Sequence, residues 1–242
     1  METELWITAF FNRVLAAPAN AILDAIHYDH DAARPWSDWF ICETLIVLFL
    51  VILFAFLRTR LSVDKPGKLQ HVFELYYDFV RASAEETIDH GAIKYVPLLG
   101  TIFLFIFSMN SLGLIPGFVA PTMFSWVPMG MALSIFIFYH SAGIKANGFG
   151  YIKQFLGPVW WLIPLLLPIE LVSHMARPFS LTLRLFANMF AGEQVSSAFV
   201  ALTKLVIPVL FIGLHAFACI LQAYIFMMLA TVYIGGAVSH DH

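Results

Sequence analysis

Five long apolar stretches run along this chain of 242 residues, with short polar segments between them. They are residues 39–57, 95–118, 126–142, 159–202 and 205–237. A helix needs about 20 apolar residues to cross the hydrocarbon core of a bilayer. The pattern therefore predicts an all-α integral membrane protein, with about five membrane helices in one transmembrane domain covering residues 1–242.

Two other segments carry apolar residues at helical spacing but are too polar to cross a membrane. Residues 65–91 are predicted to be an amphipathic interfacial helix, with Pro66 in its first turn and Gly91 at its end. Residues 1–38 are predicted to be a surface segment that contains one amphipathic helix over Leu5–Ile26.

The distribution of basic residues predicts the orientation, because Lys and Arg are enriched on the cytoplasmic side. If the end of the first stretch is cytoplasmic, eight Lys and Arg lie inside and three outside. The opposite topology would invert that bias. We therefore expect the N-terminus outside, the C-terminus in the cytoplasm, and residues 65–91 at the cytoplasmic interface.

Composition agrees with a membrane protein and excludes several other classes. Hydrophobic residues make up 60% of the chain, charged residues 12%, and mean hydropathy is +0.82. The net charge of −3 argues against a nucleic-acid partner. Cys42 and Cys219 sit in apolar runs, and the His/Asp clusters at residues 27–31 and 240–242 lack the spacing of a metal site, so we predict no metal.

Arg184 is the residue that most needs an explanation, since apolar or small residues flank it on both sides. An arginine at mid-bilayer costs about 2.5–3.5 kcal/mol on insertion scales. The guanidinium keeps its proton in proteins, so it can hold a fixed positive charge where an acid must be ionised. A purely structural ion pair would need a nearby acid, but Glu193 lies nine residues on, near the opposite face.

Other polar residues of the last two stretches fall into register if these form an antiparallel hairpin. Glu193 would face His215 and Arg184 would face Gln222, both about a turn near residues 203–204. Asn188 shares the face of Arg184 at i+4. Carboxylate and imidazole groups can pass protons, so Glu193 and His215 suit an access path near the outer turn.

A second path on the inner side could be lined by Glu170, Ser173 and His174. Asn110 in the second stretch could line a path or bond a neighbouring helix, and His140 is expected at the cytoplasmic interface. Ser180 is a further candidate for lining a path. We find no phosphate loop, nucleophile elbow or HExxH motif, so we expect neither a cofactor nor turnover of a substrate by this chain alone.

At these residues the sequence closely resembles subunit a of F-type ATP synthases. The resemblance covers about residues 35–238. The segments that carry it are RPFSL at 177–181, LRLFANMFAGE at 183–193, LQAYIFMML at 221–229, PGKLQ at 66–70 and the stretch from Asn110 to GLIP at 113–116.

The resemblance implies a role for each matching residue. Arg184 matches the family's essential arginine, which faces the carboxylates of the rotating ring of c subunits, and the last two helices form a long tilted hairpin along that ring. The remaining matches are polar channel residues: Asn188 and Gln222, Glu193 and His215 in the outer half-channel, and Glu170 in the inner one. The implied partners are the c-ring, the b subunits of the peripheral stalk, the other synthase subunits and membrane lipid.

The function implied is that of the stator subunit that delivers protons to the ring and takes them away, in a bacterial inner membrane. Two other classes of protein fit the sequence less well. A self-contained proton-coupled transporter often shows broken helices in both halves, whereas the broken and charged segments here lie in the C-terminal part. A purely structural anchor would not need polar residues inside its membrane helices.

Overall fold

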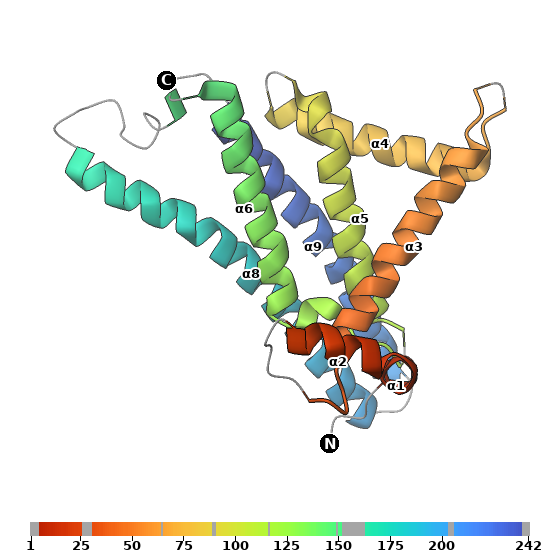
Figure 1. The fold of residues 1–242 in the computed structure, drawn as a ribbon. Coiled ribbons are helices and arrows are strands. Elements are labelled where there is room, and N and C mark those ends of the chain that lie inside the picture. The colour runs from red at the N-terminus through yellow and green to blue at the C-terminus, as the bar shows by residue number, and fades with distance from the viewer. Residues whose placement is uncertain are drawn as a thin grey trace.

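The computed structural model describes residues 5–25, 31–63, 65–88, 91–115, 117–148, 150–151, 163–202 and 206–238. Within these ranges all regular secondary structure is helical, as the sequence predicts (Figure 1). The helices are α1 (Trp6–Val14), α2 (Ala16–Ala25), α3 (Asp38–Arg60), α4 (Lys68–Thr87), α5 (Val96–Leu112), α6 (Trp126–Asn147), α8 (Ile163–Leu202) and α9 (Val206–Val238), with short 3-10 helices η1 (Ala92–Lys94) and η2 (Pro121–Met123).

Three helices in the described ranges are long and apolar enough to cross a membrane: α3, α6 and the part of α9 from Val209 to Val238. α5 is apolar but shorter, with 17 residues, because the chain turns at Gly113 instead of continuing as a helix to residue 118. α8 has 40 residues, which at 1.5 Å per residue makes it about 60 Å long. The first residues of the predicted fourth stretch, 159–162, lie outside the described ranges.

The N-terminal surface segment forms two helices where the sequence predicted one. α1 ends at Val14 and α2 begins at Ala16. Pro18 explains the break, because proline has no backbone N–H and its ring clashes with the carbonyl of the residue four positions earlier, here Val14.

α4 lies across one end of the helices that it joins, α3 and α5 (Figure 1). Val80 and Ala84 of α4 are buried, and Tyr76 Oη donates a hydrogen bond of 2.6 Å to the carbonyl of Gly100 in α5. The helix is shorter than predicted, since it starts after the N-cap Gly67 and ends at Thr87. Gly91, at φ +76°, belongs to the turn into η1, a conformation that glycine adopts without strain.

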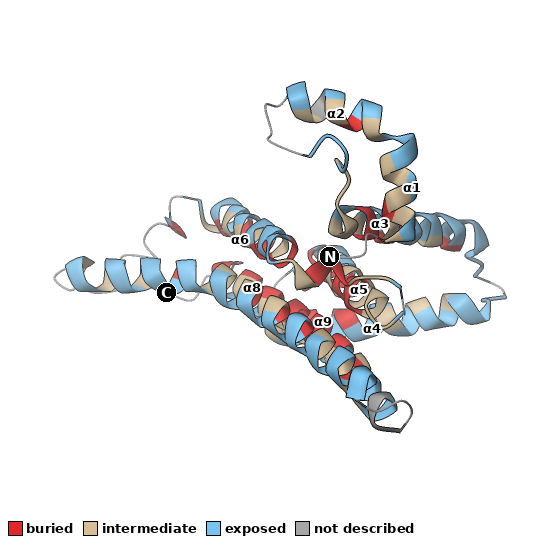
Figure 2. Cartoon of the chain, turned by 90° about the horizontal axis from the view of Figure 1, so that it is seen from below, coloured by how far each residue is buried: buried red, intermediate tan, exposed pale blue. Residues whose placement is uncertain are grey.

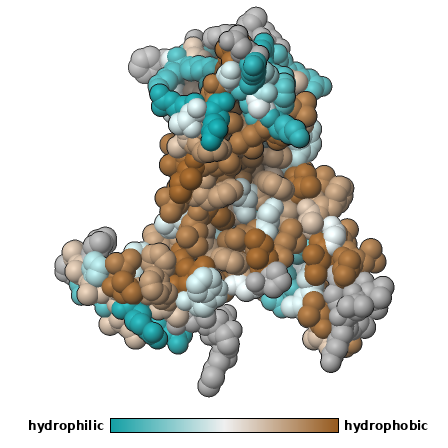
Figure 3. All heavy atoms as spheres, turned by 90° about the vertical axis from the view of Figure 1, so that its right-hand side faces the viewer, coloured by the Kyte–Doolittle hydropathy of each residue, from teal (hydrophilic) through white to brown (hydrophobic). Residues whose placement is uncertain are grey.

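The main core lies where α4, α5, α6, α8 and α9 meet, and α9 runs through it (Figure 2). The buried apolar side chains of α8 are Leu181, Leu185 and Met189, spaced four residues apart on one helical face. Other faces of α8 and α9 remain exposed, with many large apolar side chains among them. Figure 3 shows apolar side chains as a broad band below a hydrophilic cap at the α4 end.

Candidate functional site

Apart from Asn110 of α5, the predicted site residues lie on α8 and α9, which run in opposite directions and cross the rest of the bundle obliquely (Figure 1). The predicted turn at 203–204 lies outside the described residues. Two contacts define how the helices are paired. A Cβ on Gly192 would lie 3.0 Å from His215 Nδ1, and the rings of Phe199 and Phe211 stack with centroids 4.0 Å apart.

These contacts agree with the predicted hairpin register. In two antiparallel helices, the numbers of facing residues have a nearly constant sum. That sum is 407 for Gly192 and His215 and 410 for the two phenylalanines, close to the 408 and 406 of the two predicted polar pairs. The imidazole of His215 therefore packs on the backbone of α8 next to Glu193. Gly192 permits that approach, because any side chain there would press on the ring.

His215 lies inside the helix pair with 6% of its surface exposed, while Glu193 is half-buried. His215 Nε2 is fully buried and has no hydrogen-bond partner among the described residues. A buried polar nitrogen without a partner costs about 1–3 kcal/mol. An imidazole held in this state is suited to exchange a proton with water or with an acid that reaches it.

The two residues of the other predicted pair, Arg184 and Gln222, differ in how far they are buried. Gln222 is 7% exposed and lies in the helix interface, at the same face of α9 as His215. Arg184 and Asn188 are exposed, because Leu185 and Met189 take the inward face of α8. In the part of the chain that the structure describes, Arg184 has no acidic partner, so the alternative of a purely structural ion pair finds no support there.

Near the start of α8 the structure brings two of the three predicted inner residues together. His174 Nε2 lies 3.1 Å from Glu170 Oε1, and His174 Nδ1 lies 3.0 Å from Tyr139 Oη of α6. His174 is 9% exposed and Tyr139 1%. Ser173 is exposed and lies on a different face, and Ser180 is also exposed.

Sequence reasoning missed several members of this inner cluster. Tyr139 was not singled out, and His140 was expected at the interface, yet its ring lies 5.2 Å from that of His174. The guanidinium of Arg177 lies 6.0 Å from the ring centre of Tyr139 and 5.1 Å from that of Tyr233 in α9. The available signal was the spacing of residues 170, 174 and 177, which places three ionisable side chains on one face of a helix.

Asn110 has a packing role in the structure. It is fully buried in α5, and its Oδ1 accepts a hydrogen bond of 2.8 Å from Thr122 Oγ1 of η2. Of the two alternatives left open by the sequence, this contact supports the bond to a neighbouring element. Its Nδ2 has no partner within the described residues.

No group of three or more His, Cys, Asp or Glu side chains in the described ranges could hold a metal ion. Of the two clusters predicted not to bind metal, residues 27–31 and 240–242, all but Asp31 lie outside those ranges. Cys42 and Cys219 are buried and are not joined in a disulfide.

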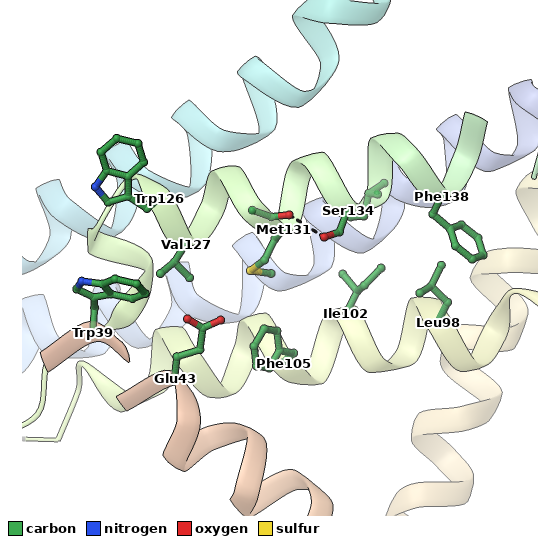
Figure 4. A pocket seen from close by; sticks show the side chains of 12 residues that line it. Trp39, Glu43, Leu98, Ile102, Phe105, Trp126, Val127, Met131, Ser134 and Phe138 are labelled. Atoms are coloured by element: carbon green, nitrogen blue, oxygen red, sulfur yellow. Dashed lines mark hydrogen bonds between the residues drawn. The ribbon is translucent and has the colours of Figure 1, made fainter. Parts of the chain in front are cut away.

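A separate cavity of about 590 Å³ opens between α3, α5 and α6. Trp39 and Trp126 stand at one end, Leu98 and Phe138 at the other, and the carboxylate of Glu43 points into it (Figure 4). Its lining residues belong to these three helices, so it is distinct from the α8–α9 surface that carries Arg184.

Comparison with known proteins gives a consistent assignment. The family model described as "ATP synthase A chain" matches residues 40–235. The chain is similar to ATP synthase subunit a of Solibacter usitatus, with 52% identity over 96% of this chain and 100% of the relative. It is 49% identical to the subunit a of Koribacter versatilis over the full length of both, and 41% identical to that of Aquifex aeolicus over 81% of this chain and 95% of the relative. With a matching family model over most of its length and relatives this similar, the chain belongs to the ATP synthase subunit a family.

Proposed function

We propose that this chain is the proton-conducting stator subunit of a bacterial F-type ATP synthase, and that it carries out no catalysis by itself. Family membership means that it assembles with other synthase subunits. The finer proposal is that two offset half-channels lead protons to and from carboxylates of a c-ring, which turns against α8 and α9. The b subunits would hold the chain in place as part of the peripheral stalk.

The observation that carries this proposal is the position of Arg184. It lies on an exposed face of α8, where Ala187, Asn188 and Ala191 are also exposed. Small residues let helices approach one another closely. A fixed cation on such a face, without an acidic partner from the described residues, is suited to face a carboxylate on another subunit.

The two polar regions at either side of Arg184 support separate proton paths. In the membrane orientation predicted from the basic residues, Glu193 and His215 lie toward the outside and Glu170 and His174 toward the cytoplasm. A proton from outside would neutralise a ring carboxylate, and the neutral site can enter lipid, whereas an ionised one would cost far too much to desolvate. After nearly a full turn the proton would leave by the inner path, and Arg184 would favour the ionised carboxylate and block a direct leak.

Arg184→Ala in the complete ATP synthase, assayed in inverted membrane vesicles, tests this function. We expect ATP-driven proton pumping to fall to background while passive proton flux persists. The control is Arg81→Ala, which removes an exposed arginine of α4 that pairs with Glu85 at 2.8 Å. Coupled pumping that survives in assembled Arg184→Ala complexes would refute the stator mechanism.

A further inference from the structure

We propose that Tyr139 and His174 form a hydrogen-bonded chain that positions the Glu170 carboxylate as a proton acceptor. The links are Tyr139 Oη to His174 Nδ1 at 3.0 Å and His174 Nε2 to Glu170 Oε1 at 3.1 Å. The inference rests on the proposed function, since it assigns the residues that prepare Glu170 for its place on the inner path.

The chemistry of the three side chains decides which atom donates in each of these hydrogen bonds. An ionised carboxylate can only accept, so His174 Nε2 carries the hydrogen that points to Glu170. In a neutral imidazole the other nitrogen is then an acceptor, and Tyr139 must donate to Nδ1. The phenol thus fixes the tautomer in which His174 supports the carboxylate.

Burial of the imidazole and the charge of Arg177 favour this neutral form of His174, whereas the Glu170 carboxylate acts in the opposite direction. The titratable and charged groups facing the cluster are Tyr139 and His140 on α6, Glu170 and Arg177 on α8, Tyr233 on α9, and Tyr151 just beyond α6. Arg177 lies about one turn along α8 from His174. Its guanidinium lies over the rings of Tyr139 and Tyr233. A second positive charge on His174 would be repelled by this guanidinium.

Tyr139 and His174 are buried and form a rigid support, whereas the Glu170 carboxylate at the end of the hydrogen-bonded series is partly exposed. Tyr139 is 1% and His174 9% exposed, while the side chain of Glu170 is 40% exposed. Tyr139 lies on α6, and Glu170 and His174 lie on α8. The carboxylate is therefore fixed from the α6 side and open on the other, where a proton can arrive or leave.

The competing explanation is that these bonds only tie α6 to α8. The pH dependence of transport distinguishes the two, because a lost N–H donor makes the carboxylate bind its proton more tightly, whereas a loosened helix contact reduces activity at every pH. His174→Leu removes the donor, and His174→Gln keeps an amide N–H at a similar reach. Tyr139→Phe removes the phenol that fixes the tautomer.

The experiment measures ATP-driven pumping by the whole complex in inverted vesicles, with the pH on the cytoplasmic side varied and complex content determined by immunoblot. For His174→Leu we expect the pH of half-maximal pumping to rise by about one unit, a tenfold change in proton affinity. Tyr139→Phe should shift it in the same direction by less, and His174→Gln should restore it to near the wild-type value. The matched control is Tyr95→Phe, which removes the hydroxyl of another tyrosine buried in the same core.

An unchanged midpoint in His174→Leu and Tyr139→Phe complexes, with pumping reduced equally at all pH values, would overturn the positioning role. The same holds if His174→Gln fails like His174→Leu although the complex assembles. Failure of this inference is separable from failure of the stator mechanism. If only the positioning role fails, Arg184→Ala still abolishes coupled pumping. If the stator mechanism fails, it does not.

Discussion

Polar side chains near the start of α8 have partners within the chain, whereas those in the middle of the helix are exposed. Near the start of the helix, Glu170 and His174 bond to each other and to Tyr139 of α6. Arg184 and Asn188 lie about two and three turns beyond Arg177. Both are exposed between apolar neighbours, and the described residues provide no acidic partner for Arg184. The polar groups of the first region have partners within the chain, whereas Arg184 in the second has no acidic partner among the described residues.

The difference predicts two kinds of mutant. Changing a polar group that the chain leaves open should reduce proton transport with little effect on stability. Changing a polar group that the chain satisfies internally, outside the hydrogen-bonded series of Tyr139, His174 and Glu170, should reduce stability first. Three substitutions of polar residues test this division, and a fourth, at Gly192, tests the packing of His215.

The largest effect is expected for Glu193→Gln, which removes the one carboxylate besides Glu170 in the described parts of α8 and α9. Loss of a positioned proton-transfer group should lower ATP-driven pumping about tenfold or more, with normal assembly. Pumping in inverted vesicles and immunoblots measure the two quantities. Gln194→Ala, at the neighbouring exposed position, is the control, and equal losses in both variants would contradict the prediction.

Gly192→Val should come next, because a Cβ would lie 3.0 Å from Nδ1 and 3.1 Å from Cε1 of His215. Overpacking of this kind costs about 1–3 kcal/mol, and here it would displace the imidazole. We expect a severalfold loss of pumping. Gly130→Val is the comparison, since nothing lies within 4 Å of a Cβ at Gly130. If the two variants pump equally well, the close approach of α9 to Gly192 is irrelevant to transport.

Thr122→Val tests a polar group that the chain satisfies internally. It removes the 2.8 Å hydrogen bond to Asn110 Oδ1, which would leave the fully buried Asn110 amide without its donor. The complex should lose about 1–3 kcal/mol of stability and melt at lower temperature, while pumping per assembled complex stays normal. Thr101→Val is the control, since the exposed Thr101 hydroxyl bonds only to Pro97 of its own helix among the described contacts. A specific loss of pumping would instead make Asn110 part of a proton path.

The smallest effect is expected for Tyr76→Phe, which removes the bond from α4 to the carbonyl of Gly100. Loss of one hydrogen bond should cost about 1 kcal/mol, seen as a slightly lower melting temperature. Burial raises the pKa of Tyr76, so the neutral phenol is favoured in the folded chain. Its contribution is complete below about pH 10, the pKa of an unfolded tyrosine, and is lost as the pH rises from there. The gap between wild type and Tyr76→Phe should therefore narrow only in strong alkali, and a gap that narrows between pH 6 and 8 would contradict this account.

The sequence by itself determined the all-helical membrane class, the amphipathic character of α4, and the polar residues of the last two helices. Each of these follows from a local property: the length of an apolar run, a helical period, or a charge that lipid does not tolerate. The predicted register of these two helices is close to the contacts of Gly192 with His215 and of Phe199 with Phe211. The roles of Arg184, Glu193, His215 and Gln222 in proton transfer stay predictions.

Only the tertiary structure decided what each polar group touches. Helix periodicity could not show that Tyr139 of α6 meets His174 of α8, since 35 residues separate them in sequence. Nor could it separate the buried Gln222 from the exposed Arg184, because the packing of Leu185 and Met189 sets the rotation of α8. Local spacing places residues on a face of a helix, and the packing of neighbouring helices decides whether that face meets a partner, the core or open surface.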